Sequence, residues 1–166
     1  MDTQLDIRED DIHPLDNVED VLHANNWTFN RMNNDELMVE VTGKSGKYRL
    51  FFIWQEDMSA LQFCAQLDIE ITENNLDLAR TALPDMNEGL WMGHFDLPKD
   101  TRKPGYRYTC LFRGSGQNTT AAIEDMVDIS LAQCERHYPL FALLASANDI
   151  NDQTLSLALM DAAGES

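Results

Sequence analysis

The sequence predicts an α+β domain in which helices pack against one antiparallel β-sheet. Two observations lead to this prediction: apolar and polar residues alternate in several short runs, and apolar residues at helical spacing flank those runs. Turn signals separate neighbouring strand patterns, which favours antiparallel pairing. The expected element order is αβββ(β)αββαα, and 166 residues suit one domain with its own core.

The first predicted element is a short helix that follows an acidic segment. Residues 1–12 are acidic and aperiodic, so we expect a flexible tail, followed by a single domain over residues 13–166. Pro14 suits the first position of a helix, because a proline there forgoes no intrahelical hydrogen bond. The pattern ends at Asn25, and its apolar stripe consists of Leu15, Val18 and Leu22.

Four strand patterns follow this helix. Residues 27–30 and 37–42 alternate between apolar and polar side chains, and a tight turn is expected over residues 43–46. Residues 48–54 are almost all apolar, so we expect a central strand that is covered on both faces. Residues 61–71 give the longest alternation, which predicts one strand with one buried face.

A second helix and two further strands are expected in the middle of the chain. Residues 76–90 carry an apolar stripe that includes Pro84, where we expect a kink. Strand patterns follow over residues 91–97 and 106–113, with an exposed hairpin tip between them.

Two helices complete the predicted order. Asn118 or Thr119 is expected to cap a long helix that bends at Pro139. The last helix, about residues 152–163, has its apolar residues on one side, and Gly164 suits its C-terminal stop.

The charge of the chain limits its partners. Twenty-nine acidic residues face twelve basic ones, which gives a net charge of −17. Binding to DNA, RNA or an anionic membrane depends on Lys and Arg to neutralise phosphate, so none of these is expected as a main partner. Two interpretations stay open: the acidic surface keeps the protein soluble, or it offers an acidic face to a basic client.

Cysteine use and the N-terminal sequence predict a cytoplasmic protein. Cys64 and Cys110 lie in strand patterns and Cys134 on a helical stripe, so we expect buried, reduced thiols rather than a disulfide or zinc site. The N-terminus lacks the features of a signal peptide, and no apolar run approaches the roughly 18 residues of a membrane span. We expect no cofactor, because the glycine-rich segment 114–120 lacks the lysine of a P-loop.

Four segments resemble the YbjN family of bacterial proteins, which are described as regulators of sensory transduction. They are HPLDNVEDVLHANNWTFNR (13–31), YRLFFIW (48–54), NEGLWMGHFDL (87–97) and AQCERHYPLFALL (132–144). The resemblance is to the shorter alphaproteobacterial type, and it covers most of the chain. It implies the α/β sandwich fold of type III secretion chaperones, which often dimerises. It carries over no catalytic residues, because the family has none established.

The corner between the second helix and the next strand is the main candidate site. Within six positions it holds Trp91, Gly93, His94, Phe95 and Asp96. His94 and Asp96 would share a strand face, and a carboxylate can tune an imidazole as a general base. A binding pocket is one alternative. Another is that both residues hydrogen-bond the corner while Gly93 gives the backbone its freedom. Catalysis would also need a nucleophile and an oxyanion stabiliser, of which the sequence gives no signature.

A second candidate is a local basic patch of Arg49, Arg107 and Arg113. Arg107 and Arg113 are expected to share a face of their strand, where they could hold an anionic ligand or a phosphorylated partner. The alternative is cross-strand pairing, worth ~0.2–1 kcal/mol for each pair, with the carboxylates of Glu40, Asp68 and Glu70.

These patterns predict a non-enzymatic cytoplasmic protein, regulatory or chaperone-like, that forms a homodimer and holds a protein or peptide partner. The alternative is a small-molecule sensor or enzyme with a pocket near Trp91, His94 and Asp96. Tryptophans are expected as core anchors rather than ligand stackers, and this applies to Trp27, Trp54 and Trp91.

Overall fold

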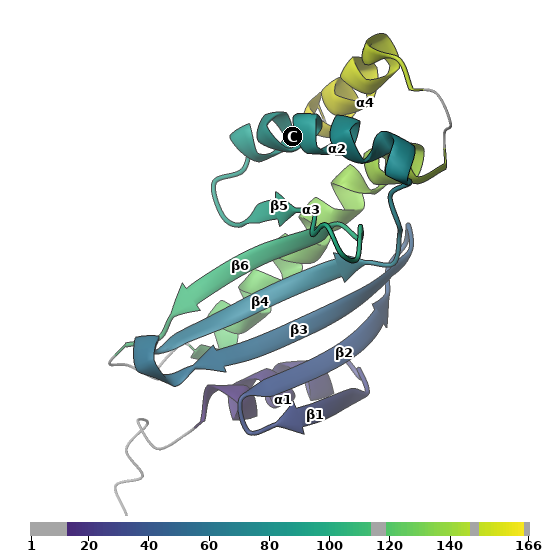
Figure 1. Cartoon of the computed structure of the whole chain (residues 1–166). Helices are drawn as coiled ribbons and strands as arrows, with labels where there is room; N and C mark the ends of the chain where they lie inside the picture. The colour runs from purple at the N-terminus through teal and green to yellow at the C-terminus, as the bar shows by residue number, and fades with distance from the viewer. Residues whose placement is uncertain (1–12, 114–118, 147–149, 165–166) are drawn as a thin grey trace, which may run out of the picture.

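A six-stranded antiparallel sheet forms the centre of the molecule, with strands in the order β1-β2-β3-β4-β6-β5. The computed structural model describes residues 13–113, 119–146 and 150–164, so the predicted tail lies outside the described residues. The predicted α+β class and element order are confirmed (Figure 1). The elements are α1 (Pro14–Ala24), β1 (Phe29–Asn33), β2 (Glu36–Thr42), β3 (Lys47–Gln55), β4 (Ala60–Leu67), α2 (Leu76–Glu88), β5 (His94–Asp96), β6 (Gly105–Leu111), α3 (Thr119–Ser146) and α4 (Asp152–Gly164).

The first helix begins and ends where the sequence predicts. The Nδ1 atom of His13 accepts a hydrogen bond from the backbone N–H of Leu15 at 3.1 Å, so this side chain caps the helix. At the other end, the Asn25 side-chain amide donates to the carbonyl of Val21 at 2.8 Å. The helix packs on the sheet and on α3 through its apolar stripe of Leu15, Val18, Val21 and Leu22.

Strand β3 is central but is covered by helices on one face, so the prediction of cover on both faces is wrong. Its residues alternate strictly, and Leu50 and Phe52 are fully buried against the helices. Phe51 and Ile53 point to the opposite face and are half-buried among side chains of the neighbouring strands. In Figure 1, α1 and α3 lie behind the sheet and leave its front face open. We call this front surface the open face.

The predicted alternation over residues 61–71 is present in the burial of the side chains, but only part of this segment pairs as a strand. Strand β4 ends at Leu67, whereas the prediction extended it to Ile71. Ile69 and Ile71 are nevertheless buried, so the period of two continues past the end of the strand. The backbone N–H of Ile71 donates to the carbonyl of Arg102 at 2.9 Å, outside the regular ladder. The apolar pattern therefore extends further than the pairing does.

Two helices run through an internal proline. Pro84 lies inside α2 and Pro139 inside α3, and both helices continue on either side. Both prolines are on exposed faces, so water can reach the carbonyls that lose their helical partners. Helix α3 begins at Thr119, and Asn118 lies outside the described residues.

The turn between β2 and β3 packs tightly against α3. The backbone N–H of Ser45 donates to a carboxylate oxygen of Glu135 at 2.9 Å. A Cβ added to Gly46 would lie only 2.3 Å from the hydroxyl oxygen of Tyr138. The tight turn predicted at residues 43–46 is therefore held by a helix that is far away in the sequence.

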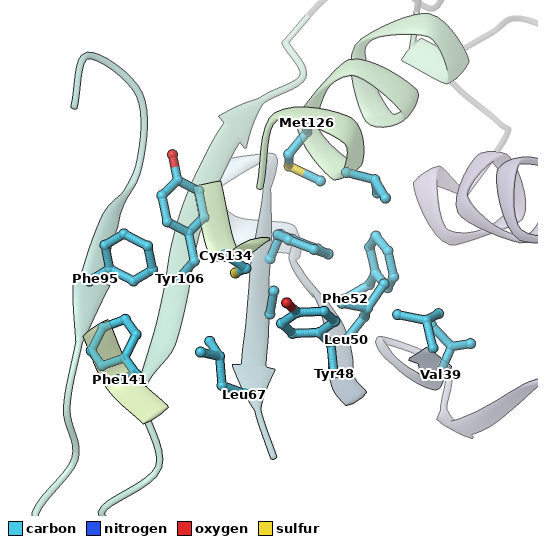
Figure 2. Close-up of a cluster of buried hydrophobic side chains, with 14 of the residues drawn as sticks. Val39, Tyr48, Leu50, Phe52, Leu67, Phe95, Tyr106, Met126, Cys134 and Phe141 are labelled. Carbon is cyan, nitrogen blue, oxygen red and sulfur yellow. The ribbon is translucent and has the colours of Figure 1, made fainter. Parts of the chain in front are cut away.

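The core lies between the inner face of the sheet and the helices. Figure 2 shows part of it, with Phe95, Tyr106 and Phe141 gathered on one side. The thiol of Cys134 is buried in this cluster, and the three described cysteines are free. Within the described residues, no helix is long and apolar enough to cross a bilayer.

Candidate functional site

The corner between α2 and β5 is held by a side-chain amide that the sequence reasoning missed. The Asn87 carbonyl oxygen accepts the backbone N–H of Phe95 at 2.7 Å, and its amide donates to the Phe95 carbonyl at 3.1 Å. One of the alternatives gave this role to His94 and Asp96, whereas the structure shows Asn87, at the end of α2, hydrogen-bonded to the edge strand. The sequence feature that could have indicated this role is an asparagine near the end of a helix, because asparagine side chains readily form hydrogen bonds with nearby backbone groups.

The backbone of the corner depends on Gly93, as predicted. Its φ angle is +70°, which disfavours any side chain. A Cβ there would lie 2.6 Å from the ring of Tyr106 and 2.7 Å from the carbonyl oxygen of Arg107. Burial raises the pKa of Tyr106 to about 12, so its hydroxyl stays protonated and donates to the carbonyl of Met92.

Trp91 is the most exposed large apolar side chain described. It is 99% exposed, so the prediction that it anchors the core is wrong, whereas Trp54 is buried as predicted. The predicted strand over residues 91–97 is also too long, because β5 begins only at His94. The residue after Trp91, Met92, has a fixed side chain, because the Tyr108 hydroxyl donates a hydrogen bond to the Met92 sulfur at 3.1 Å. Trp91 therefore projects from a fixed loop into solvent.

The remaining corner residues divide between surface and core. His94 and Asp96 share the outward face of β5, as predicted, and Asp96 lies 3.3 Å from the guanidinium of Arg107. Phe95 points the other way and is only 2% exposed. Its ring contacts three others, with centroid distances of 4.7 to 5.3 Å, from Tyr106, His137 and Phe141. The corner thus combines an exposed tryptophan, an exposed imidazole and an ion pair over a rigid base.

Two arginines of the predicted basic patch, Arg49 and Arg107, are paired with carboxylates. Arg49 pairs with Glu40 at 2.9 Å across β2 and β3, as the alternative proposed. Arg107 pairs with Asp96 instead of the three predicted carboxylates. Arg113 lies beyond the end of β6, so it does not share a strand face with Arg107. Cross-strand pairing accounts for the first two arginines.

The thiols are poorly suited to nucleophilic chemistry. Burial raises the pKa of Cys134, Cys64 and Cys110, so all three stay protonated near neutral pH. Arg107 lies close to Cys64 and favours its thiolate, but the effect of burial is larger. Among the described residues, no group of three or more His, Cys, Asp or Glu side chains could hold a metal ion.

A cavity of about 460 Å³ lies next to this corner, between α2, α3 and α4. Leu90 lines it, but Trp91, His94 and Asp96 do not. The sequence reasoning missed this cavity, because it depends on how three separate helices pack.

These observations define a small α+β protein with an open sheet face and an exposed aromatic corner. The chain belongs to the YbjN family: the family model, described as "Putative bacterial sensory transduction regulator", matches residues 14–143. Among solved structures, YbjN from E. coli, described as "a putative transcription regulator", is similar with a TM-score of 0.50 and 13% identity, over 75% of this chain and 93% of that one. At this identity the likeness shows the fold alone. No curated protein sequence matches the chain.

Proposed function

We propose that this protein is a non-enzymatic cytoplasmic regulator that holds a protein or peptide partner at the α2–β5 corner. The observation that carries the proposal is the complete exposure of Trp91 on a loop whose backbone is hydrogen-bonded at Met92 and Phe95. Tryptophan is enriched among residues that dominate binding energy in protein interfaces. The description of the family as regulators of sensory transduction supports the regulatory part.

The corner is suited to binding because it is already ordered. Asn87 fixes β5 against α2, and the hydroxyl of Tyr106 fixes the loop at Met92. A partner that covers Trp91 would therefore gain apolar contact without ordering the backbone first. His94 and the Asp96–Arg107 pair would supply polar contacts at the rim of the same surface.

Trp91→Ala is expected to abolish capture of the partner while leaving the unfolding midpoint unchanged, because a fully exposed side chain contributes little to stability. Capture from source lysate, with the captured proteins identified by mass spectrometry, is the measurement. Met32→Ala is the matched control, because Met32 is 61% exposed at the opposite edge of the sheet. A partner that both variants retain would contradict the proposal.

The homodimer is a separate proposal, in which a second copy covers the open face. Phe51 and Ile53 stand there half-buried beside Met38, on a surface that α1 and α3 leave open. Phe51→Glu is expected to convert a dimer into a monomer in sedimentation equilibrium, because a carboxylate would be buried without a partner. A wild-type monomer at high concentration, or a dimer that tolerates this change, would refute it.

A cytoplasmic location and the absence of a nucleic-acid partner complete the proposal. Three free cysteines suit a reducing compartment. A net charge of −17 repels phosphate backbones, and the arginines at positions 49 and 107 are already paired with carboxylates.

A further inference from the structure

A groove lies between α2 and α4, next to the exposed corner. Exposed residues of both helices line it, among them Glu88 and Met160, so the groove opens to solvent. Leu90 is the last residue of the lining on the α2 side, and the exposed Trp91 follows it in the chain. Figure 1 shows α4 beside α2 at the top of the molecule. We call this cavity of about 460 Å³ the α2–α4 groove.

Apolar side chains from both helices line the α2–α4 groove. Met86 on α2 and Ala162 on α4 are buried. Leu90 and Leu159 are half-buried, and Met160 is 67% exposed. Sites for drug-sized ligands usually have about 300–1,000 Å³, so this groove has room for more than one side chain of a partner.

The lining residues of α4 recur at helical spacing. They are Ser156, Leu159, Met160 and Ala163, so one face of α4 lines the groove over two turns. At about 1.5 Å per residue, this face is roughly 10 Å long. A helix lying along it would present side chains at positions i, i+3, i+4 and i+7 over the same length.

The walls of the groove favour a helical occupant over an extended one. Helices bond their backbone groups internally except in the first and last turns, so α2 and α4 offer no continuous row of N–H and C=O groups. An extended peptide in the groove would bury its own backbone groups without partners, which is unfavourable. A helix satisfies its own backbone groups and contributes only side chains, as in other complexes in which a helix occupies an apolar groove.

Charge around the groove favours a basic helix. Asp85 and Glu88 are exposed on α2, and Asp161 is exposed on α4. Arg136 is the basic residue of the lining, and it is half-buried on the α3 side. The last 22 residues of the chain carry four acidic residues and no basic one. Lysine or arginine on the outer side of a bound helix would meet the exposed carboxylates at the rim, where both charges stay in water.

We propose that the α2–α4 groove binds an amphipathic helix of the partner, with its apolar face in the groove, basic residues on its polar face and one end against Trp91. This inference rests on the proposed function, because the helix continues onto the corner that holds the partner there. It also names the chemistry of that partner. One wall of the groove, α4, lies beyond the residues 14–143 that match the family model.

The test uses the full chain and a helical peptide of about 14 residues, with leucine at positions i, i+3, i+4 and i+7 and lysine at most others. A second peptide has the same composition in alternating order, and a third has glutamate in place of lysine. Calorimetric titration at about 0.15 M salt, which screens distant charges, gives the affinities. We expect the second and third peptides to bind at least about tenfold more weakly than the first. No binding of the helical peptide, or equal affinity for the first two peptides, would overturn the proposal.

Two exposed apolar residues of α4 provide a matched pair of variants. Met160 lines the groove and is 67% exposed, whereas Leu157 is 56% exposed and does not line it. Met160→Gln is expected to weaken binding of the helical peptide at least about fivefold, and Leu157→Gln to leave it unchanged. Both variants should keep the wild-type unfolding midpoint, because neither side chain is buried. Equal effects of the two changes on binding would refute the groove.

Trp91→Ala separates this inference from the proposed function. We expect it to weaken binding of the helical peptide as Met160→Gln does. Binding that Trp91→Ala weakens and Met160→Gln does not would refute the groove and leave the corner as the partner site. Binding that only Met160→Gln weakens would support the groove and refute the contact at Trp91.

Discussion

Phe95→Ala is expected to lower the free energy of unfolding by about 3–5 kcal/mol, the largest loss for any single change at the corner. Phe95 is 2% exposed, and its ring packs against Tyr106, His137 and Phe141. Truncation removes these contacts and leaves a cavity that a three-residue edge strand and a long helix cannot close. Urea denaturation of both proteins, followed by circular dichroism, measures the loss.

Phe51→Ala is the control for this change, since the residue types are the same and the environments differ. Phe51 is half-buried on the open face, so its truncation should cost roughly 1–2 kcal/mol. Losses of equal size for the two variants would mean that Phe95 is not the packing centre of the corner. A larger loss for Phe51→Ala would indicate that a second copy covers the open face.

Gly93→Ala has the second-largest expected effect, a loss of about 2–4 kcal/mol. Two causes act together: the φ angle of +70° strains any side chain, and the new Cβ would meet the Tyr106 ring and the Arg107 carbonyl oxygen. The loss should appear as a lower urea midpoint with an unchanged slope.

Gly89→Ala and Gly93→Asn distinguish these causes. Gly89 ends α2 in a right-handed conformation with nothing within 4 Å of an added Cβ, so alanine there should stabilise by up to about 1 kcal/mol. Asparagine tolerates positive φ better than alanine but carries the same Cβ. Gly93→Asn should therefore stay destabilised, and full stability in that variant would show that the close contact does not matter.

The spacing of apolar residues predicted the order of helices and strands, because each helix buries one apolar stripe and each strand buries one apolar face. The helix that begins at Pro14 and the hairpin turn over residues 43–46 follow from patterns within a few positions. The last helix, Asp152–Gly164, agrees with its predicted bounds to within one residue. These features need no knowledge of distant parts of the chain.

The failures at the candidate site have the opposite origin. Phe51 contacts a helix or solvent depending on which face of the sheet α3 covers. The sequence of β3 alone does not predict that face. Trp91 is apolar and precedes a strand, so its pattern is that of a core residue, yet the chain turns at Gly93 before β5 starts. The Asn87 bridge spans a turn whose geometry only the folded chain defines.

The strand order also divides the sheet into local and long-range pairings. Strands β1 to β4 pair with their neighbours along the chain, so residues 29–67 can form a meander through short loop closures alone. Strand β6 follows α2 and β5 in the sequence and pairs with β4, so this pairing closes a longer loop. Strand β5 pairs with β6 at the edge of the sheet. The corner that carries Trp91 thus lies beside an outermost strand whose partner β6 joins the sheet through a long-range pairing. The local meander of β1 to β4 therefore does not contain the surface around Trp91, which is complete only when β4 and β6 have paired.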